Sequence, residues 1–403
     1  MSGKGLNNFF KEYLNEKSIF LNKRVLQASY NPENVLHREK EVNLIANILA
    51  PILKKEKPSN VFIYGKTGTG KTLTMKYISD HINDVADEKK IQVKIIYLNC
   101  KLKRVADTEY RLIAQLVREF GKDIPPTGLP TDEVYNIFFK TIEDSEVILL
   151  LILDEIDQLV NKAGDEIIYN LTRINTELDK SQISLVGISN SLVFTDNLDP
   201  RVRSSLSEEE VLFPPYNALQ IQDILKKRAS IAFNSGVIGP GVIEKCAAYA
   251  AREHGDARRA IELLRVAGEL TERKKKKKIR LQELDRAQEK IEKDRVIDTI
   301  QTQPKQSQTA LYCITSLINE MKNKTYTGEI YEKYKTLCIN LNLRPLTQRR
   351  ISDIIAELDM LGIVNTNVVS RGRYGRTKEI TIGYPLSMTT KIRKILESEL
   401  GLS

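Results

Sequence analysis

The sequence predicts an α/β fold, with a mainly parallel sheet that carries a phosphate-binding loop, then a helical region and a terminal domain of helices with one hairpin. Two observations support this prediction. Apolar runs alternate with helical patterns up to about residue 213, and the first run ends in a glycine-rich loop. Beyond that point the pattern is helical until a hairpin near the C-terminus. A chain of 403 residues exceeds one ordinary core, and we expect domains at 1–213, 214–300 and 301–403.

The glycine-rich loop follows the apolar run 61–64 and reads G-x-x-x-x-G-K-T at residues 65–72, with a helical pattern directly after it. This order of strand, loop and helix is typical of a phosphate-binding loop. Its glycines let backbone N–H groups converge on phosphate oxygens, and the helix adds the positive end of its dipole. The lysine can reach the β- and γ-phosphates, and the last threonine can hold Mg²⁺. We expect nucleotide contacts from Gly65, Lys66, Thr67, Gly68, Thr69, Gly70, Lys71, Thr72 and Leu73.

Five apolar runs are strand candidates: Val61–Tyr64, Val93–Leu98, Val147–Leu153, Ser184–Ser189 and Val211–Phe213. The third run is apolar throughout, which is typical of a central strand buried on both faces. It ends at Asp154 and Glu155, and the carboxyl ends of parallel strands form the edge where ligands bind. There Asp154 can hold Mg²⁺, and Glu155 can orient and deprotonate an attacking water. The alternative is a solvated acidic turn.

Further polar positions are candidates for the same site. Asn190 ends the fourth run and can help to place the water, although asparagine is also common in turns. Arg201 and Arg203 follow a proline turn, where either can reach a neighbour's γ-phosphate as an arginine finger or can cap a surface helix. The pair Gly-Asp at residues 255–256 is typical of a helix stop and an N-cap. That placement puts Arg258 in the first turn of the next helix, facing phosphate across the domain cleft.

The C-terminal segment is predicted to bind DNA. Residues 299–403 carry 15 lysines and arginines against 9 acidic residues, which is +6 of the chain's +9. Three helical stretches are followed by strands at 363–369 and 378–382, and together they make a winged helix-turn-helix. Its third helix would offer its polar face to the major groove, and the arginine-rich hairpin tip can enter the minor groove. The expected DNA contacts are Gln348, Arg349, Arg350, Arg371, Gly372, Arg373, Tyr374 and Arg376.

Alternatives to DNA binding exist for each of these features. The basic excess also fits a solubilising surface or a thermophilic source, and a wing of this kind can pack on protein instead. Upstream, residues 273–278 read Arg followed by five lysines. We interpret this run as a solvated, self-repelling loop, with DNA contact as the alternative. A charged helix is expected over 281–301, and residues 301–309 have linker composition, so we place the last domain boundary there.

Several classes of site and location are not supported by the sequence. The four cysteines (Cys100, Cys246, Cys313 and Cys338) are scattered without a C-x-x-C pair, which favours reduced thiols over disulfides or zinc. The three histidines are far apart. No apolar run approaches the roughly 20 residues that span a bilayer, and the N-terminus lacks the apolar core of a secretory signal. We therefore expect a cytoplasmic protein, associated with the nucleoid and without a membrane partner.

Taken together, the motifs resemble those of the archaeal replication initiators related to the eukaryotic origin-recognition complex and cell-division-control proteins, which are AAA+ ATPases. The resemblance covers nearly the whole chain. It is carried by residues 34–39, the phosphate loop, Asp154-Glu155, Asn190, residues 200–202, 213–216 and 255–260, and the wing 371–376. It implies an AAA+ domain with a helical lid and a winged-helix domain, with ATP or ADP and Mg²⁺ as cofactors.

The resemblance also implies residue roles. The adenine is bordered by Val35, His37 and Arg38, and the lid contacts the nucleotide through Tyr216 and Arg228. The catalytic group by resemblance is Lys71, Asp154, Glu155, Asn190 (sensor one), Arg201 (arginine finger) and Arg258 (sensor two). The family's DNA-contacting insert falls at about residues 101–121, with these candidates: Lys101, Lys103, Arg104 and Arg111.

The favoured function is an ATP-dependent initiator that binds duplex DNA at replication origins, alongside other initiator protomers, and recruits the minichromosome-maintenance helicase. Its ATP hydrolysis is expected to be slow and to act as a switch. One alternative is a DNA motor or clamp loader with continuous, DNA-stimulated turnover. The other is a transcription regulator that uses ATP only as a structural ligand.

Overall fold

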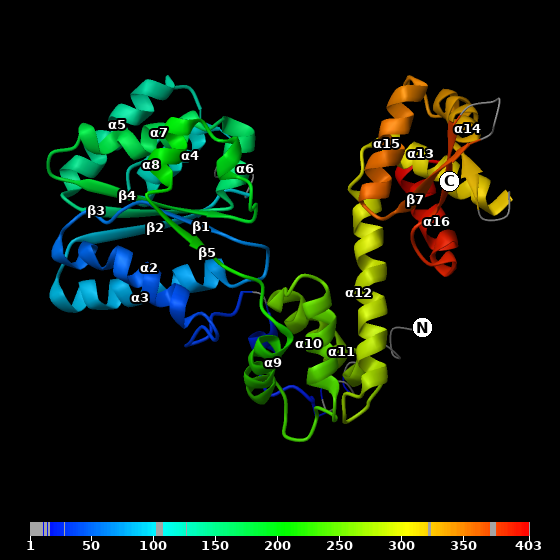
Figure 1. Cartoon of the computed structure of the whole chain (residues 1–403), viewed down its shortest axis with the longest axis horizontal. Helices are drawn as coiled ribbons and strands as arrows, with labels where there is room; N and C mark the ends of the chain where they lie inside the picture. Colours follow the sequence, from blue (N-terminus) through cyan, green and yellow to red (C-terminus); the bar gives the residue numbers. More distant parts are fainter. Residues whose placement is uncertain are drawn as a thin grey trace. The chain divides into compact units, whose positions relative to one another are not determined.

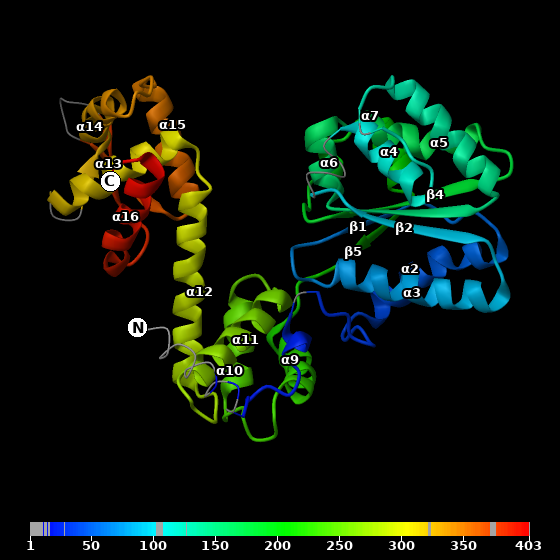
Figure 2. The same ribbon diagram turned by 180° about the vertical axis from the view of Figure 1, so that it is seen from behind.

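The structure is a computed structural model that describes residues 11, 14, 17–27, 29–101, 108–125, 127–320, 324–370 and 376–402. Contacts divide the chain into two units, Met1–Leu284 and Asp285–Ser403. The first unit contains a five-stranded sheet and a set of lid helices, and the second contains helices with a three-stranded sheet. Each unit can be followed from two sides in Figures 1 and 2.

The sheet of the first unit is parallel, with the strand order β2-β3-β4-β1-β5. Its strands are β1 (Val61–Tyr64), β2 (Val93–Asn99), β3 (Ile148–Asp154), β4 (Gln182–Ser189) and β5 (Glu209–Leu212). Every neighbouring pair runs parallel, which confirms the predicted α/β class. The fifth strand begins two residues before the apolar run that predicts it. As an edge strand it buries only Val211, so polar residues can occupy its other positions.

Helices cover both faces of this sheet (Figure 1). One face carries α2 (Glu39–Leu49) and α3 (Lys71–Lys89); the other carries α4 (Glu109–Glu119), α5 (Thr131–Ser145), α6 (Ile156–Ala163), α7 (Glu166–Arg173) and α8 (Pro200–Leu206). Side chains of β3 alternate between the two cores: Leu149 and Leu151 pack with α4 to α8, and Leu150 and Ile152 pack with α2 and α3. The strand is therefore buried on both faces, as predicted, and it delivers Asp154 to the carboxyl edge of the sheet.

The lid consists of α9 (Ala218–Ala232), α10 (Val242–Arg252) and α11 (Ala257–Arg273). The Asp256 side chain is the N-cap of α11, because its Oδ1 accepts the N–H groups of Arg258 at 2.8 Å and Arg259 at 3.2 Å. This confirms the predicted Gly-Asp helix boundary. The next helix is α12 (Leu281–Gln301), which has the predicted bounds of the charged helix.

The second unit is a winged helix-turn-helix, as predicted. Its elements are α13 (Lys305–Glu320), β6 (Thr325–Tyr326), α14 (Thr327–Asn340), α15 (Gln348–Met360), β7 (Val364–Ser370), β8 (Arg376–Ile382) and α16 (Thr389–Leu400). The strands are antiparallel in the order β6-β8-β7. Two of these elements, β6 and α16, were not predicted from the sequence. The strand β6 has only two residues, which is too short to show a period in the sequence. Helix α16 adds buried side chains such as Ile392 and Leu396 to the core of this unit.

The predicted linker at residues 301–309 is wrong. Helix α12 continues to Gln301 and α13 begins at Lys305, so only three residues separate them. The polar side chains have partners that composition does not reveal. Gln308 donates from Nε2 to the backbone carbonyls of Ile300 and Gln301, at 3.3 and 3.2 Å, which satisfies the end of α12.

All four cysteines are buried and unpaired, which agrees with the prediction of reduced thiols. Burial raises the pKa of Cys100, Cys246 and Cys313 to about 12. In the described part of the chain, no helix has the length and apolar character to cross a bilayer.

Replacing Leu151 with alanine should destabilise the first unit, because this side chain is fully buried in the core between β3 and the helices of one face. We expect the free energy of unfolding to fall by about 2–5 kcal/mol. Calorimetry should show a lower Tm for the first unit and an unchanged transition for the second. The matched control is Leu219→Ala, at a side chain that is 70% exposed, which should leave both transitions in place.

Candidate nucleotide-binding site

The phosphate-binding loop joins the end of β1 to the start of α3. Gly70 is the N-cap of α3 with φ +96°, and Lys71 is the first helical residue, so the backbone N–H groups of this helix end face the loop. Gly68 also has a left-handed φ, of +72°. These conformations favour glycine and confirm the strand, loop and helix order read from the sequence.

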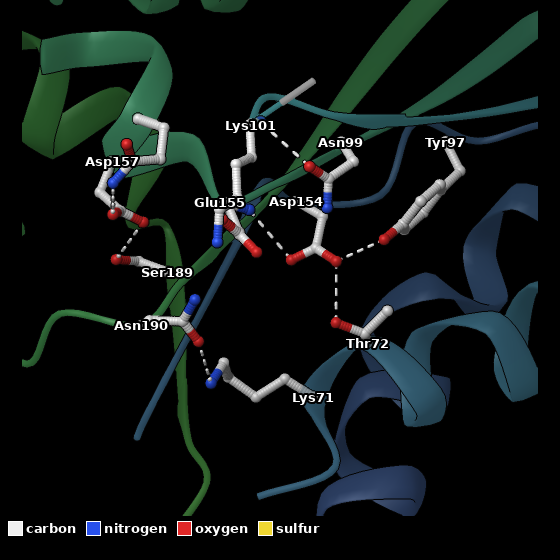
Figure 3. Close-up of polar contacts among 11 residues, drawn as sticks. Lys71, Thr72, Tyr97, Asn99, Lys101, Asp154, Glu155, Asp157, Ser189 and Asn190 are labelled. Atoms are coloured by element: carbon white, nitrogen blue, oxygen red, sulfur yellow. Dashed lines mark hydrogen bonds and ion pairs between the residues drawn. The ribbon is translucent and has the colours of Figure 1, made fainter. Parts of the chain in front are cut away.

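The Lys71 side chain extends from the start of α3 toward Asn190 (Figure 3). Its Nζ donates to the backbone carbonyl of Gly65 at 2.6 Å, to that of Lys66 at 2.8 Å, and to Oδ1 of Asn190 at 3.0 Å. Burial lowers the pKa of the Lys71 ammonium to about 8, against the opposing effect of Asp154. The structure therefore brings together two of the predicted catalytic residues, Lys71 from α3 and Asn190 from the end of β4.

Asp154 receives three hydrogen bonds at the carboxyl end of β3. Its Oδ2 accepts from the Thr72 hydroxyl at 2.8 Å and from the hydroxyl of Tyr97, and its Oδ1 accepts the Glu155 N–H at 2.9 Å. The carboxylate and the Thr72 hydroxyl are thus adjacent oxygen ligands of the kind that Mg²⁺ prefers. Among the described residues no cluster of three or more Cys, His, Asp and Glu side chains could hold a metal ion. A cation here would complete its shell with phosphate and water, which is the usual Mg²⁺ arrangement.

Glu155 lies next to Asp154 in a left-handed conformation, with φ +56°. The Lys101 ammonium lies 3.8 Å from its Oε2, and the Lys101 N–H donates to Oδ1 of Asn99 at 3.0 Å. From the sequence, Lys101 is predicted to contact DNA. The structure instead pairs its charge with the proposed catalytic carboxylate, as Figure 3 shows, and the DNA role stays a prediction.

Two neighbouring cavities extend from the loop. A polar one of about 110 Å³ is lined by the loop, Tyr97, Asp154, Glu155, Asn190 and Arg258. A larger one of about 600 Å³ is lined by Val35 and Leu36 from the segment before α2, by loop residues, and by lid residues that include Tyr216, Arg228 and Arg258. The first is suited to phosphate and a cation, and the second has the size and mixed lining of a nucleoside pocket. Arg258 lines both cavities.

The lid touches the phosphate loop at two glycines. A Cβ on Gly68 would lie 1.8 Å from Oδ1 of Asp256, and a Cβ on Gly70 would lie 2.7 Å from the Tyr216 hydroxyl. The Ala257 N–H also donates to the Gly68 carbonyl at 3.3 Å. This contact brings the first turn of α11, and with it Arg258, to the phosphate loop.

Of the other predicted nucleotide contacts, one lines the large cavity, and the others bind residues of the protein itself. Arg228 lines the large cavity, although its Nη1 also donates to the Val25 carbonyl at 2.9 Å. Arg38 is 2% exposed, and its guanidinium binds the protein backbone. It donates to the carbonyls of Thr69 at 2.9 Å and Pro214 at 2.5 Å. Arg38 therefore fastens the phosphate loop to the start of the lid. The His37 ring lies 3.2 Å from the carboxylate of Asp223.

The two candidate arginine fingers are exposed on α8. Arg201 pairs with Asp199 at 3.1 Å and Arg203 lies 3.9 Å from Asp196, with side chains 73% and 55% exposed. The Asp199 side chain also caps the helix by accepting the Arg201 N–H at 2.8 Å. Neither arginine lines the two cavities.

The predicted DNA contacts are described in part. Gln348, Arg349 and Arg350 are exposed in the first turn of α15, and Arg350 lies 3.6 Å from Glu357 and 3.9 Å from Asp353 on the same helix. Arg111 lies in the first turns of α4. The remaining candidates lie outside the described residues, or, for Arg376, outside the described side chains: Lys103, Arg104, Arg371, Gly372, Arg373, Tyr374 and Arg376.

Several residues of the site were not predicted from the sequence. Tyr97 donates to Asp154 because β2 lies beside β3 in register, with Tyr97 opposite Ile152. Tyr30 and the lid residue Ile224 line the large cavity. No local motif marks these positions, although the presence of an aromatic hydroxyl near the end of a strand that neighbours β3 would have been a usable signal.

Comparisons with known proteins find family models over most of the chain. Residues 54–193 match a model described as an AAA domain. Residues 222–289 match the Cdc6 AAA+ ATPase-type lid domain, and residues 298–391 match the CDC6 C-terminal winged helix domain. The three matches follow the order of sheet, lid and winged helix seen in the structure.

Relatives are similar over nearly the full length. The ORC1-type DNA replication protein 1 of Methanosarcina mazei is 51% identical over 395 residues, which cover 97% of this chain and 94% of the relative. The ORC1-type DNA replication protein of Pyrococcus abyssi is 52% identical over 381 residues, covering 94% and 90%. The structure of the Aeropyrum pernix ORC1 protein in complex with DNA matches with a TM-score of 0.83 and 44% identity, covering 96% of this chain and 98% of that one.

Replacing Tyr97 with phenylalanine should weaken the cation site, because the phenol is one of the three donors that orient Asp154. We expect the Mg²⁺ concentration that supports half-maximal nucleotide hydrolysis to rise about tenfold to a hundredfold, as is usual when a partner of a metal ligand is removed. Nucleotide binding without Mg²⁺ should not change. The matched control is Tyr110→Phe, whose hydroxyl donates to the Pro125 carbonyl. An unchanged Mg²⁺ requirement in Tyr97→Phe would contradict the orienting role.

Proposed function

The chain belongs to the family of ORC1-type and Cdc6 replication initiators, and on this premise we propose that it is an ATP-dependent initiator acting at replication origins. In this proposal it binds duplex DNA at the origin, assembles there with other initiator protomers and promotes loading of the minichromosome-maintenance helicase. Its relatives support the role in replication, and the Aeropyrum pernix protein's complex supports DNA as the ligand. We propose the cytoplasm, in association with the nucleoid, as its location.

The observation that carries the proposal is that Arg258 lies where the two cavities meet the lid. This lid side chain lines both the phosphate cavity and the nucleoside cavity. A nucleotide bound through Lys71 and Arg258 would tie the lid to the sheet, and loss of the γ-phosphate would release that tie. Coupling of this kind is worth about 1–3 kcal/mol. We propose that the protein uses ATP as a switch rather than as a source of continuous motion.

The chain's own residues supply the hydrolytic chemistry. Thr72 and Asp154 would hold Mg²⁺, which would neutralise charge on the phosphates. Lys71 stabilises negative charge on the transferred phosphoryl group, and Glu155 orients and deprotonates the attacking water with help from Asn190. The Lys101 ammonium lies 3.8 Å from Oε2 of Glu155, beside the carboxylate proposed to act on the water.

We propose slow hydrolysis because the finger must come from another protomer. Arg201 and Arg203 are exposed and turned to acidic neighbours on their own surface. An arginine that stabilises the transition state from a neighbour raises the rate only in the assembly. Either arginine can fill this role.

We propose three functional domains: 1–213 for nucleotide binding, 214–300 as the lid and 301–403 for DNA binding. In the last of these, Arg349 and the wing arginines would contact DNA, and Arg350 would do so less, because it already faces two acids on its own helix.

Replacing Lys71 with alanine should abolish ATP binding, because it removes the cation that three loop and strand acceptors hold in place. Duplex affinity should be largely retained, since the contacts proposed for α15 and the wing belong to a separate domain. Calorimetry with ATP and anisotropy with a labelled duplex measure the two properties in one preparation. Loss of both activities would contradict separate modules.

Replacing Arg373 or Arg349 with alanine should weaken duplex binding and flatten its salt dependence. Removing one phosphate contact reduces the slope of log affinity against log salt by about 0.9. The matched control is Arg393→Ala, which removes the same charge from α16, where Arg393 pairs with Glu397 at 2.9 Å. A slope that is unchanged, or equal to that of the control, would count against a phosphate contact at the substituted arginine.

The proposed cellular role is tested by mapping the protein's binding sites on its genome. An initiator should occupy one or a few origins, and occupancy of many promoters would point to a transcription regulator. A steady-state ATPase assay with and without duplex separates a switch from a motor. Rapid turnover stimulated by duplex would overturn the switch.

A further inference from the structure

A lysine-rich loop joins α11 to α12 on the lid. It covers residues 274–280, and the side chains of Lys274, Lys277 and Lys278 are exposed. We propose that this loop is a second nucleic-acid contact, which binds the phosphate backbone of the duplex held by the winged-helix domain. The inference rests on the proposed DNA-binding function and adds to it a site on the lid, outside the wing, α15 and the residue 101–121 segment.

The backbone of the loop is fixed at its start. Lys275 donates its N–H to the Glu272 carbonyl at 2.8 Å, and Lys276 donates its N–H to the Thr271 carbonyl at 3.0 Å. These bonds close the end of α11 in a pattern whose left-handed position is usually glycine. Here that position is Lys275, with φ +54°. A side chain in this conformation is sterically unfavourable. Lysine therefore occupies a position at which glycine would be less strained.

The loop is also fixed at its far end. Ile279 is fully buried and exchanges backbone hydrogen bonds with the segment before α10: its N–H donates to the Val237 carbonyl at 2.8 Å, and its carbonyl accepts from Gly239 at 2.9 Å. Lys276 forms an ion pair at 2.5 Å with Glu283, whose side chain is 1% exposed. The exposed lysines therefore project from a backbone that hydrogen bonds fix at both ends of the loop.

Nearby acidic side chains are already engaged. Glu269 pairs with other basic side chains at 2.9 and 2.7 Å, and Glu272 accepts a serine hydroxyl at 2.6 Å. In the part of the chain that the structure describes, no ion pair joins an acid to Lys274, Lys277 or Lys278. Like charges held together without counter-charges raise the local positive potential and attract polyanions.

The chemistry of the loop fits phosphate. Lysine ammonium groups act as point charges that contact phosphates without reading sequence. Residues 273–278 contain no aromatic or apolar side chain, so this run lacks the anchors that dominate protein interfaces. One helix, α12, connects the loop to the winged-helix domain. A duplex that engages both would gain affinity from this tether, because the second contact is then intramolecular.

The test is a triple substitution in the full chain, Lys274→Gln with Lys277→Gln and Lys278→Gln. Lys275 and Lys276 are left in place because they close α11. Anisotropy with a labelled duplex of about 40 base pairs, between roughly 50 and 200 mM salt, gives the slope of log affinity against log salt. We expect the slope to fall by about 2 to 3, at about 0.9 per phosphate contact, and the affinity at low salt to drop at least about tenfold.

The matched control removes three exposed lysines elsewhere on the first unit: Lys40→Gln with Lys54→Gln and Lys90→Gln. It makes the same change in net charge and should alter the slope by less than about 0.9, the value for one phosphate contact. ATP affinity and Tm should match the unmodified protein in both variants, which shows that the lid remains folded.

Two results would overturn the proposal while leaving DNA binding intact. One is a triple variant whose slope is unchanged or equals that of the control. The other is a triple variant with an unchanged slope that no longer binds an acidic peptide, such as oligoglutamate, that the unmodified chain binds. The loop would then be a protein contact. If the unmodified chain binds no duplex, the proposed function fails along with the loop's role, so the two failures can be told apart.

Discussion

The lid can lie on the phosphate loop because two loop residues have no side chain. At Gly68 the space that a Cβ would need is occupied by Asp256, and at Gly70 it is occupied by the Tyr216 hydroxyl. This close approach places the N-terminus of α11 at the loop, so that one arginine lines two cavities. Nucleotide recognition and lid position therefore depend on the same contact, and a bulkier loop would separate them.

The second constraint is the burial of β3. A strand packed on both faces has a fixed direction and register, and its last residue, Asp154, must appear at the carboxyl edge of the sheet. The neighbouring strands end at the same edge and bring Tyr97 from β2 and Asn190 from the end of β4. Polar chemistry is thus concentrated where parallel strands end, which is the general location of ligands in open α/β sheets.

The features predicted well from sequence are those decided by neighbours along the chain. The phosphate loop, the acidic end of β3 and the cap at Asp256 all follow from local patterns. The features that were not predicted depend on distant partners. Tyr97 acquires its role from strand order, Arg38 from contact with Pro214, and Gln308 from the end of another helix. Composition alone predicts a linker at the Gln- and Ser-rich residues 301–309, because it does not reveal those partners.

The burial of every thiol makes the chain convenient for spectroscopy. At neutral pH, raised pKa values keep Cys100, Cys246 and Cys313 protonated, so they should react slowly with maleimides and resist oxidation. The sequence also contains no tryptophan. A fluorophore on one engineered surface cysteine of the lid would then be the only label, and its colour or lifetime would report in real time whether the proposed movement of the lid occurs.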